Sequence, residues 1–179
     1  MFTRLGDSGD TDNSRRERVS KASIHIEVEG TVDELNSFLG MALDMTMWDD
    51  MRKDIDRMQE NVFRLGEHII ASANGRTIKD EDVAWLEERV NVYRKEVGKI
   101  TLFVVPGGSP QASSLHIART VSRRLERLIV LYAHEKEISR IVMQYANRIS
   151  SLLFMMALAS NRRLNVEERI WPLRPPSHP

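Results

Sequence analysis

The chain has no cysteine among its 179 residues. This absence excludes a disulfide-bonded scaffold, a zinc site built from thiolates and a cysteine nucleophile. Neither sign of charge is in excess, because 26 basic residues face 26 acidic ones. No overall field therefore attracts the protein to nucleic acid or to a membrane surface. A site for an anion must be a local cluster of positive charge.

Long apolar runs are also missing. The first residues, MFTRLGDSGD, lack the apolar core of a signal peptide, and no apolar run approaches the ~20 residues that cross a bilayer. We therefore expect a cytoplasmic protein without a membrane partner. A chain of this length suits one domain with a substantial core and is short for two. Residues 1–179 are predicted to form a single domain.

Apolar residues are concentrated between position 31 and about position 165. Residues 1–22 are polar and rich in Gly, Ser, Thr, Asp and Arg, without helical or strand periodicity. The chain closes with WPLRPPSHP, whose prolines exclude a regular helix, so residues 172–179 are expected to form an irregular tail. Irregular ends therefore flank a regular middle.

The middle of the chain reads as five amphipathic helices. Thr31 and Glu34 fit a capping box, which predicts that the first helix begins at Thr31. Ser109 fits an N-cap with Pro110 in the first turn. Apolar residues at helical spacing place the other helices at about 49–73, 80–98, 109–133 and 137–160, with a short extended run at 101–105. Short connections favour an all-α fold, an antiparallel five-helix bundle.

The fourth helix carries the stretch ARTVSRRLER, residues 118–127. Helical geometry places four polar side chains in one narrow strip, away from most apolar residues of the helix: His116, Arg119, Arg123 and Glu126. Two guanidinium groups one turn apart suit a polyphosphate, because each offers a planar fork of donors to paired oxygens. In that interpretation Glu126 holds an arginine in position across a turn.

A second interpretation of the strip is a solvated helix face with ion pairs between successive turns, and taken alone the strip favours it. By itself His116 is more typical of a partly buried polar residue than of a catalyst. Nucleic acid is a weak third interpretation, because no aromatic residues alternate with the arginines. We therefore expect no nucleic-acid partner.

The N-terminal stretch TRLGDSGDT, residues 3–11, is a second candidate anion site. It lacks the glycine spacing and the lysine of a P-loop, yet its glycines allow consecutive backbone N–H groups to converge on an anion. Its carboxylates, Asp7 and Asp10, repel a bare phosphate and better suit the surroundings of a bound Mg²⁺. The alternative, which the stretch taken alone favours, is a disordered polar N-terminus. Candidate contacts are Thr3, Arg4, Gly6, Gly9, Thr11 and, further on, Lys21.

Taken together, these motifs resemble those of one family, the ATP:cob(I)alamin (corrinoid) adenosyltransferases of the trimeric five-helix type, found in propanediol utilisation and mitochondrial B12 metabolism. The similarity spans about 3–171, and its most specific part is 103–127. The motifs that carry it are, in order, TRLGDSGDT, ERVSK, EGTVDELNS, FVVPGGSPQASSLHIARTVSRRLER, YANRISSLLF and ERIW.

The resemblance implies transfer of the 5′-deoxyadenosyl group of ATP to the cobalt of reduced cobalamin. Co(I) attacks the 5′ carbon, a cobalt–carbon bond forms and triphosphate leaves. Preorganised arginines, backbone N–H groups and Mg²⁺ are expected to stabilise such a leaving group. The protein supplies no nucleophile in this reaction, which agrees with the absence of cysteine.

The resemblance also implies roles for individual residues. Arg119 and Arg123 would contact the ATP phosphates, with Glu126 nearby. Asp33 would pair with Arg119 of the partner subunit, in a homotrimer whose sites lie at subunit interfaces. Residues near the N-terminus would wrap the nucleotide: Thr3, Arg4, Gly6, Asp7, Gly9, Thr11 and Lys21.

The corrinoid side of the site is implied in the same way. Phe103 would cover the lower face of the corrin, displacing the lower axial ligand and leaving a four-coordinate Co(II) that is easier to reduce. Asn147 would lie near the nucleotide, and His116 on the corrinoid side. From the residues alone, Phe103 suits a core position and Asn147 a buried polar network. Implied partners are a reductase and a B12-dependent enzyme.

One segment departs from the family pattern. Many members have a glycine-rich stretch before ERVSK, where this chain has DTDNSRR, and Asp10 adds a second carboxylate near the expected phosphates. This departure favours an alternative function, an ATP- or cobalamin-binding carrier that delivers adenosylcobalamin with little turnover. A helical scaffold without a ligand is a third hypothesis.

Overall fold

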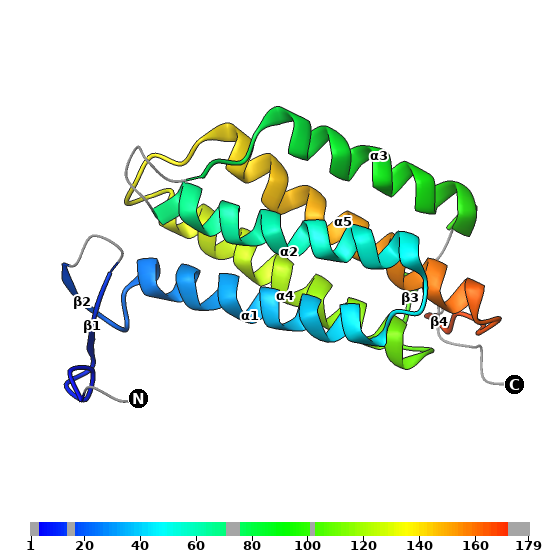
Figure 1. Ribbon diagram of the computed structural model, residues 1–179, viewed down its shortest axis with the longest axis horizontal. Coiled ribbons are helices and arrows are strands. Elements are labelled where there is room, and N and C mark those ends of the chain that lie inside the picture. The colour runs from blue at the N-terminus through cyan, green and yellow to red at the C-terminus, as the bar shows by residue number, and fades with distance from the viewer. Residues whose placement is uncertain (1–3, 14–16, 71–75, 101–102, 172–179) are drawn as a thin grey trace, which may run out of the picture.

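A computed structural model describes residues 4–13, 17–70, 76–100 and 103–171. Five long helices form one bundle in which α1, α3 and α5 run in one direction and α2 and α4 in the other (Figure 1). The predicted all-α antiparallel five-helix bundle is confirmed. The helices are α1 (Ile24–Met45), α2 (Asp49–Ile70), α3 (Asp80–Val97), α4 (Pro110–Tyr132) and α5 (Arg140–Arg163).

The first helix begins earlier than the sequence predicts. Thr31 is buried inside α1, and its hydroxyl donates to the backbone oxygen of Glu27 at 2.8 Å. The predicted cap at Thr31 is therefore wrong. Residues before it join the helix because this turn packs on the bundle, where Val28 is fully buried. Burial of an apolar face outweighs a local capping signal.

The start of the fourth helix agrees with its prediction. Ser109 caps α4, and its Oγ accepts a hydrogen bond from the Ala112 backbone N–H at 3.1 Å, with Pro110 in the first turn. Gly98 follows the last residue of α3, as expected. The predicted end of the second helix near Asn74–Gly75 lies outside the described residues.

Two short antiparallel ribbons lie at opposite ends of the bundle (Figure 1). Strands β1 (Asp10–Asp12) and β2 (Arg18–Ser20) pair beside the start of α1, so residues 1–22 contain regular structure that the sequence did not predict. Strands β3 (Phe103–Val104) and β4 (Ile170–Trp171) pair at the other end, within the expected extended run and just before the tail. The tail, 172–179, lies outside the described residues.

Helix α5 lies at the centre of the bundle, in contact with α3 and α4. It is long and apolar enough to cross a membrane, but 61% of its most apolar window is buried inside the bundle. Side chains along its length, such as Tyr145, Leu152 and Met156, are fully buried. Its apolar character is therefore accounted for by the protein core.

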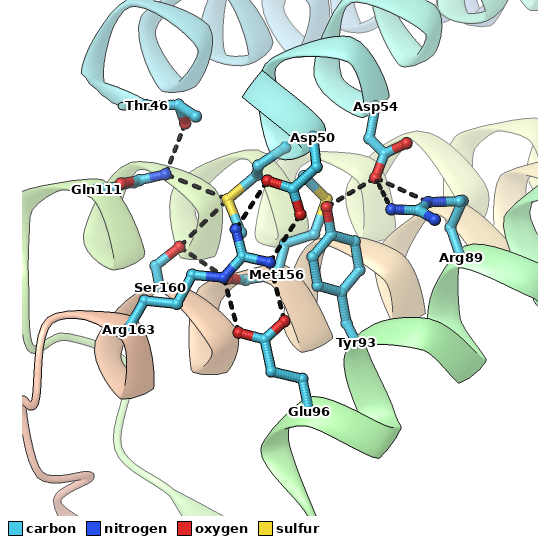
Figure 2. Close-up of polar contacts among 11 residues, drawn as sticks. Thr46, Asp50, Asp54, Arg89, Tyr93, Glu96, Gln111, Met156, Ser160 and Arg163 are labelled. Carbon is cyan, nitrogen blue, oxygen red and sulfur yellow. Dashed lines mark hydrogen bonds and ion pairs between the residues drawn. The ribbon is translucent and has the colours of Figure 1, made fainter. Parts of the chain in front are cut away.

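Ion pairs join α2, α3 and α5 at the end of the bundle that carries β3 and β4 (Figure 2). Arg163 donates to Asp50 at 2.7 Å and to Glu96 at 2.7 Å. Asp54 is buried and accepts from Arg89 Nε at 2.8 Å. Both of these half-buried arginines therefore have carboxylate partners, as burial of a charge requires.

Candidate functional site

Arg119 and Arg123 lie one turn apart on the side of α4 that borders α5. Arg119 is half-buried; its Nε donates to Nδ1 of His116 at 3.4 Å, and its guanidinium carbon lies 5.9 Å from the ring centre of Phe154 in α5. Arg123 is exposed. The packing of α4 on α5 thus fixes one guanidinium and leaves the second at the surface beside it.

Neither guanidinium has a carboxylate partner within the described part of the chain. Burial lowers the pKa of Arg119, and the charge of Arg123 lowers it further. By contrast, Arg124 lies off the strip and pairs with Glu34 of α1. The two arginines of the strip therefore form an uncompensated positive pair, which suits an anion. Arg123 is exposed, as on a solvated face, but the ion pairs between successive turns expected there do not occur among the described residues.

Glu126 does not hold an arginine in position, contrary to that expectation. Its Oε1 accepts from Nδ2 of Asn147 at 2.7 Å, and Oδ1 of Asn147 accepts from Nη1 of Arg148 at 2.6 Å. Asn147 therefore belongs to a polar network, as its residue type suggested, but it is exposed rather than buried. Packing of α4 on α5 thus brings together two residues that the sequence singled out separately.

His116 lies beneath Arg119, with only 3% of its surface exposed. Its Nδ1 accepts from an arginine, which places the proton of the neutral ring on Nε2. Burial lowers the pKa of His116 to about 4, with a further contribution from the charge of Arg119. The imidazole is therefore neutral at pH 7 and orients Arg119 without adding charge. Its expected contact with a corrinoid stays a prediction.

The N-terminal candidates fold back on one another. The Lys21 ammonium donates to the Gly6 carbonyl at 2.8 Å, and the Lys21 backbone N–H donates to the Gly9 carbonyl at 2.9 Å. Gly9 has φ +87°, a left-handed conformation that favours glycine. Thr11 pairs with Val19 in the hairpin. Thr3 lies outside the described residues, whereas Arg4 and Asp7 are exposed in the same loop.

One chain does not bring all the predicted site residues together. The N-terminal loop lies at one end of the bundle and Phe103, on β3, at the other (Figure 1). Phe103 is 69% exposed, so its interpretation as a core residue is wrong. Asp33 is exposed on α1, and its carboxylate makes no hydrogen bond or ion pair with another described residue, Arg119 included.

Phe154 is a site residue that the sequence motifs did not indicate, and its ring lies against two residues of the strip. Its ring centre lies 6.1 Å from that of His116, and Arg119 lies over the same ring. Phe154 occurs two helical turns after Asn147, which places both on the face of α5 that meets the strip. That spacing is the signal that could have identified it.

Comparison with known proteins agrees with a helical bundle that carries an anion site. Residues 1–160 match the family model of cobalamin adenosyltransferases. The corrinoid adenosyltransferase of Bacillus subtilis is 36% identical over 172 residues, which cover 93% of this chain and 89% of the relative. The cobalamin adenosyltransferase of Cupriavidus metallidurans is also 36% identical, over 96% of this chain and 93% of that relative.

A solved structure agrees as well. It is a phenylalanine-to-histidine variant of the PduO-type ATP:corrinoid adenosyltransferase from Lactobacillus reuteri, complexed with cobalamin and ATP. It superposes with a TM-score of 0.90 at 28% identity, covering 97% of each chain. The present chain belongs to the cobalamin adenosyltransferase family, as its motifs indicated.

Proposed function

We propose that this protein is an ATP:corrinoid adenosyltransferase, which transfers the 5′-deoxyadenosyl group of ATP to the cobalt of cob(I)alamin and releases triphosphate. The observation that carries the proposal is the positive pair Arg119 and Arg123, which has no carboxylate partner among the described residues. Relatives at 36% identity are named for this activity, and a structural neighbour holds both substrates.

The arginine pair would bind the triphosphate of ATP. Charge increases on the triphosphate as the 5′ carbon–oxygen bond breaks, so donors already in place stabilise the transition state more than the ground state. The neutral His116 ring holds Arg119 in this orientation through its Nδ1 acceptor. Asn147 is hydrogen-bonded to Glu126, one turn after Arg123, and would lie near the nucleotide. The chain thus orients ATP, while the corrinoid cobalt is the nucleophile.

Mg²⁺ is expected to bind with ATP. Within the described residues, no group of three His, Asp or Glu side chains could hold a metal ion alone, and Mg²⁺ is usually held by substrate phosphates, water and one or two carboxylates. Asp7 and Asp10 lie in the loop proposed to wrap the nucleotide and would contact the ion directly or through water. When bound, Mg²⁺ would neutralise part of the phosphate charge and reduce the repulsion between these carboxylates and ATP.

A homotrimer with sites between subunits accounts for the separation of the site residues within one chain. A second copy would bring its N-terminal loop, with Lys21, to the arginine pair. Asp33, whose carboxylate has no partner among the described residues of its own chain, would then pair with Arg119 of the partner subunit. Phe103 would cover the lower face of the corrin, which suits its exposure. Such a cytoplasmic enzyme requires a reductase for cobalt and supplies a B12-dependent enzyme.

Incubation with ATP, Mg²⁺ and chemically reduced cobalamin tests the proposal. The expected result is the visible spectrum of a cobalt–carbon product, together with free triphosphate. Tight binding of ATP by calorimetry without product would instead identify a carrier. Neither binding nor product would identify a scaffold, and either of these outcomes would overturn the proposed function.

A further inference from the structure

One side-chain amide links three segments at the end of the bundle that carries Phe103. Asn161, in the last turn of α5, is fully buried. Its Oδ1 accepts from the Ser109 backbone N–H at 2.9 Å. Its Nδ2 donates to the Gly107 carbonyl at 3.0 Å and to Oε1 of Glu168 at 3.0 Å. Both amide hydrogens and the amide oxygen are therefore used.

The turn is shaped to receive this amide. Gly108 has φ +100°, and a Cβ at that position would lie well inside van der Waals contact with all three polar-end atoms of the Asn161 side chain. Any residue other than glycine would displace the amide. The Asn161 amide thus occupies the space that a Cβ at position 108 would fill, so this turn requires glycine.

The segments that Asn161 links are continuous with the two elements that carry the proposed site, β3 with Phe103 and α4 with the arginine pair. The turn at Gly107 follows β3, which carries Phe103, and Ser109 caps α4, which carries the arginine pair. Glu168 precedes β4, and the Val105 backbone N–H donates to the Arg169 carbonyl at 2.7 Å beside it. The β3–β4 ribbon and the start of α4 are therefore hydrogen-bonded to the same side chain, that of Asn161.

We propose that Asn161 is a positioning residue for the transfer reaction, which fixes the ribbon bearing Phe103 relative to the arginine pair of α4. The inference rests on the proposed function and on the role proposed there for Phe103. Asn161 is buried and acts through Phe103, so it contacts neither substrate. Its loss should impair the step that depends on Phe103, reduction of four-coordinate Co(II), more than transfer from Co(I).

The decisive variant is Asn161→Asp, which is isosteric. It keeps an acceptor for the Ser109 N–H but loses both donors and places a second carboxylate beside Glu168, whose pKa burial already raises. The matched control is Ser160→Ala. Ser160 is equally buried, but its hydroxyl donates to the Met156 carbonyl (Figure 2) and to the Met51 sulfur, and to neither β3 nor β4.

Two rates are measured for each protein, product formation from chemically reduced Co(I) and from Co(II) with a reductant. The electron paramagnetic resonance spectrum of Co(II)alamin bound with ATP is recorded as well. For Asn161→Asp, which loses two hydrogen bonds but acts on the reaction only through Phe103, we expect a roughly tenfold loss of the Co(II) rate, about 1.4 kcal/mol, and a weaker four-coordinate signal. The Co(I) rate and the KM for ATP should stay near wild type, as should every value for Ser160→Ala.

Combining Asn161→Asp with Glu168→Gln exchanges donor and acceptor and should restore part of the Co(II) rate. If Asn161→Asp fails to fold, Glu168→Ala removes one of the three contacts and should lower the Co(II) rate in the same direction. The inference is overturned if the ratio of the Co(II) rate to the Co(I) rate is unchanged in a folded variant, whether both rates stay at wild type or both fall by the same factor. Failure of the proposed function is distinct, because wild type would then form no product from Co(I).

Discussion

At the scale of single residues, the arginine pair provides the sharpest test of the proposed polyphosphate site. Arg119→Ala should lower turnover by ~10²–10³-fold, as for loss of one preorganised donor to a developing negative charge. The free energy of unfolding should fall by no more than about 1 kcal/mol, because loss of the contact with the buried His116 is partly offset by removal of a half-buried charge. Turnover and urea denaturation measure the two effects.

The matched control is Arg127→Ala, an exposed arginine of the same helix. Its turnover should stay within about threefold of wild type, a difference well below 1 kcal/mol. Equal losses in Arg119→Ala and Arg127→Ala would mean that general positive charge on α4, rather than the oriented pair, supports the reaction.

A second prediction at this scale concerns His116 and pH. Its pKa falls from 6.5 to about 4 on folding, so between these values the unfolded chain binds more protons than the folded chain. The stability from the neutral ring is therefore present above pH 6.5 and is lost as pH falls toward 4. The loss should reach at most about 3 kcal/mol.

Chemical denaturation of wild type and His116→Asn at pH 7 and pH 4.5 measures this contribution. Asn keeps an acceptor for Arg119 but does not titrate, so the variant should lose less stability than wild type over this interval. His134→Asn is the control, because His134 is exposed. Identical pH dependence in His116→Asn and wild type would exclude the buried neutral ring.

At the scale of helices, local signals predicted some boundaries and missed others. Ser109 with Pro110 identified the start of α4, because a cap and a first-turn proline act within a few residues. Thr31 and Glu34 predicted the wrong start for α1, because packing of the preceding turn extends the helix back to Ile24. The strip on α4 was visible from periodicity. The partner of Glu126 was not, because Asn147 reaches it through packing of α5.

The ion pair between α2 and α3 gives a prediction at this scale. Asp54→Ala leaves Arg89 and the buried hydroxyl of Tyr93 without their shared acceptor. Removal of one member of a buried pair should destabilise the bundle by about 3 kcal/mol. Asp56→Ala, at an exposed position on the same helix, should change the free energy of unfolding by less than about 0.5 kcal/mol.

Chemical denaturation compares these two variants, and turnover of folded Asp54→Ala should match wild type because this pair lies outside the proposed site. A stability loss no larger than that of Asp56→Ala would show that the pair contributes little. A turnover defect in the folded variant would place the network in the reaction.

At the scale of the whole molecule, the chain has zero net charge and distributes its proposed site over both ends of one bundle. Composition predicted that an anion site must be local, and the arginine pair fits that expectation. Periodicity cannot show that the loop and Phe103 lie at opposite ends, since this depends on the direction of each helix. That separation is the physical reason to expect a site shared between subunits.

Complementation between two inactive variants tests the shared site. Lys21→Ala removes a proposed contact of the N-terminal loop, and Arg123→Ala removes one from α4. In a cyclic trimer with sites between neighbours, each mixed trimer contains one interface at which the intact loop faces the intact arginine. Isolated mixed trimers should therefore restore roughly a third of wild-type turnover, since one site in three is intact. Co-expression with different affinity tags, followed by isolation of mixed oligomers, provides the sample.

Mixing Arg119→Ala with Arg123→Ala is the control and should restore none, because both residues belong to the same strip of one chain. If loop and arginines of the same chain formed each site, the first mixture would also stay inactive, and the proposed arrangement between subunits would be wrong.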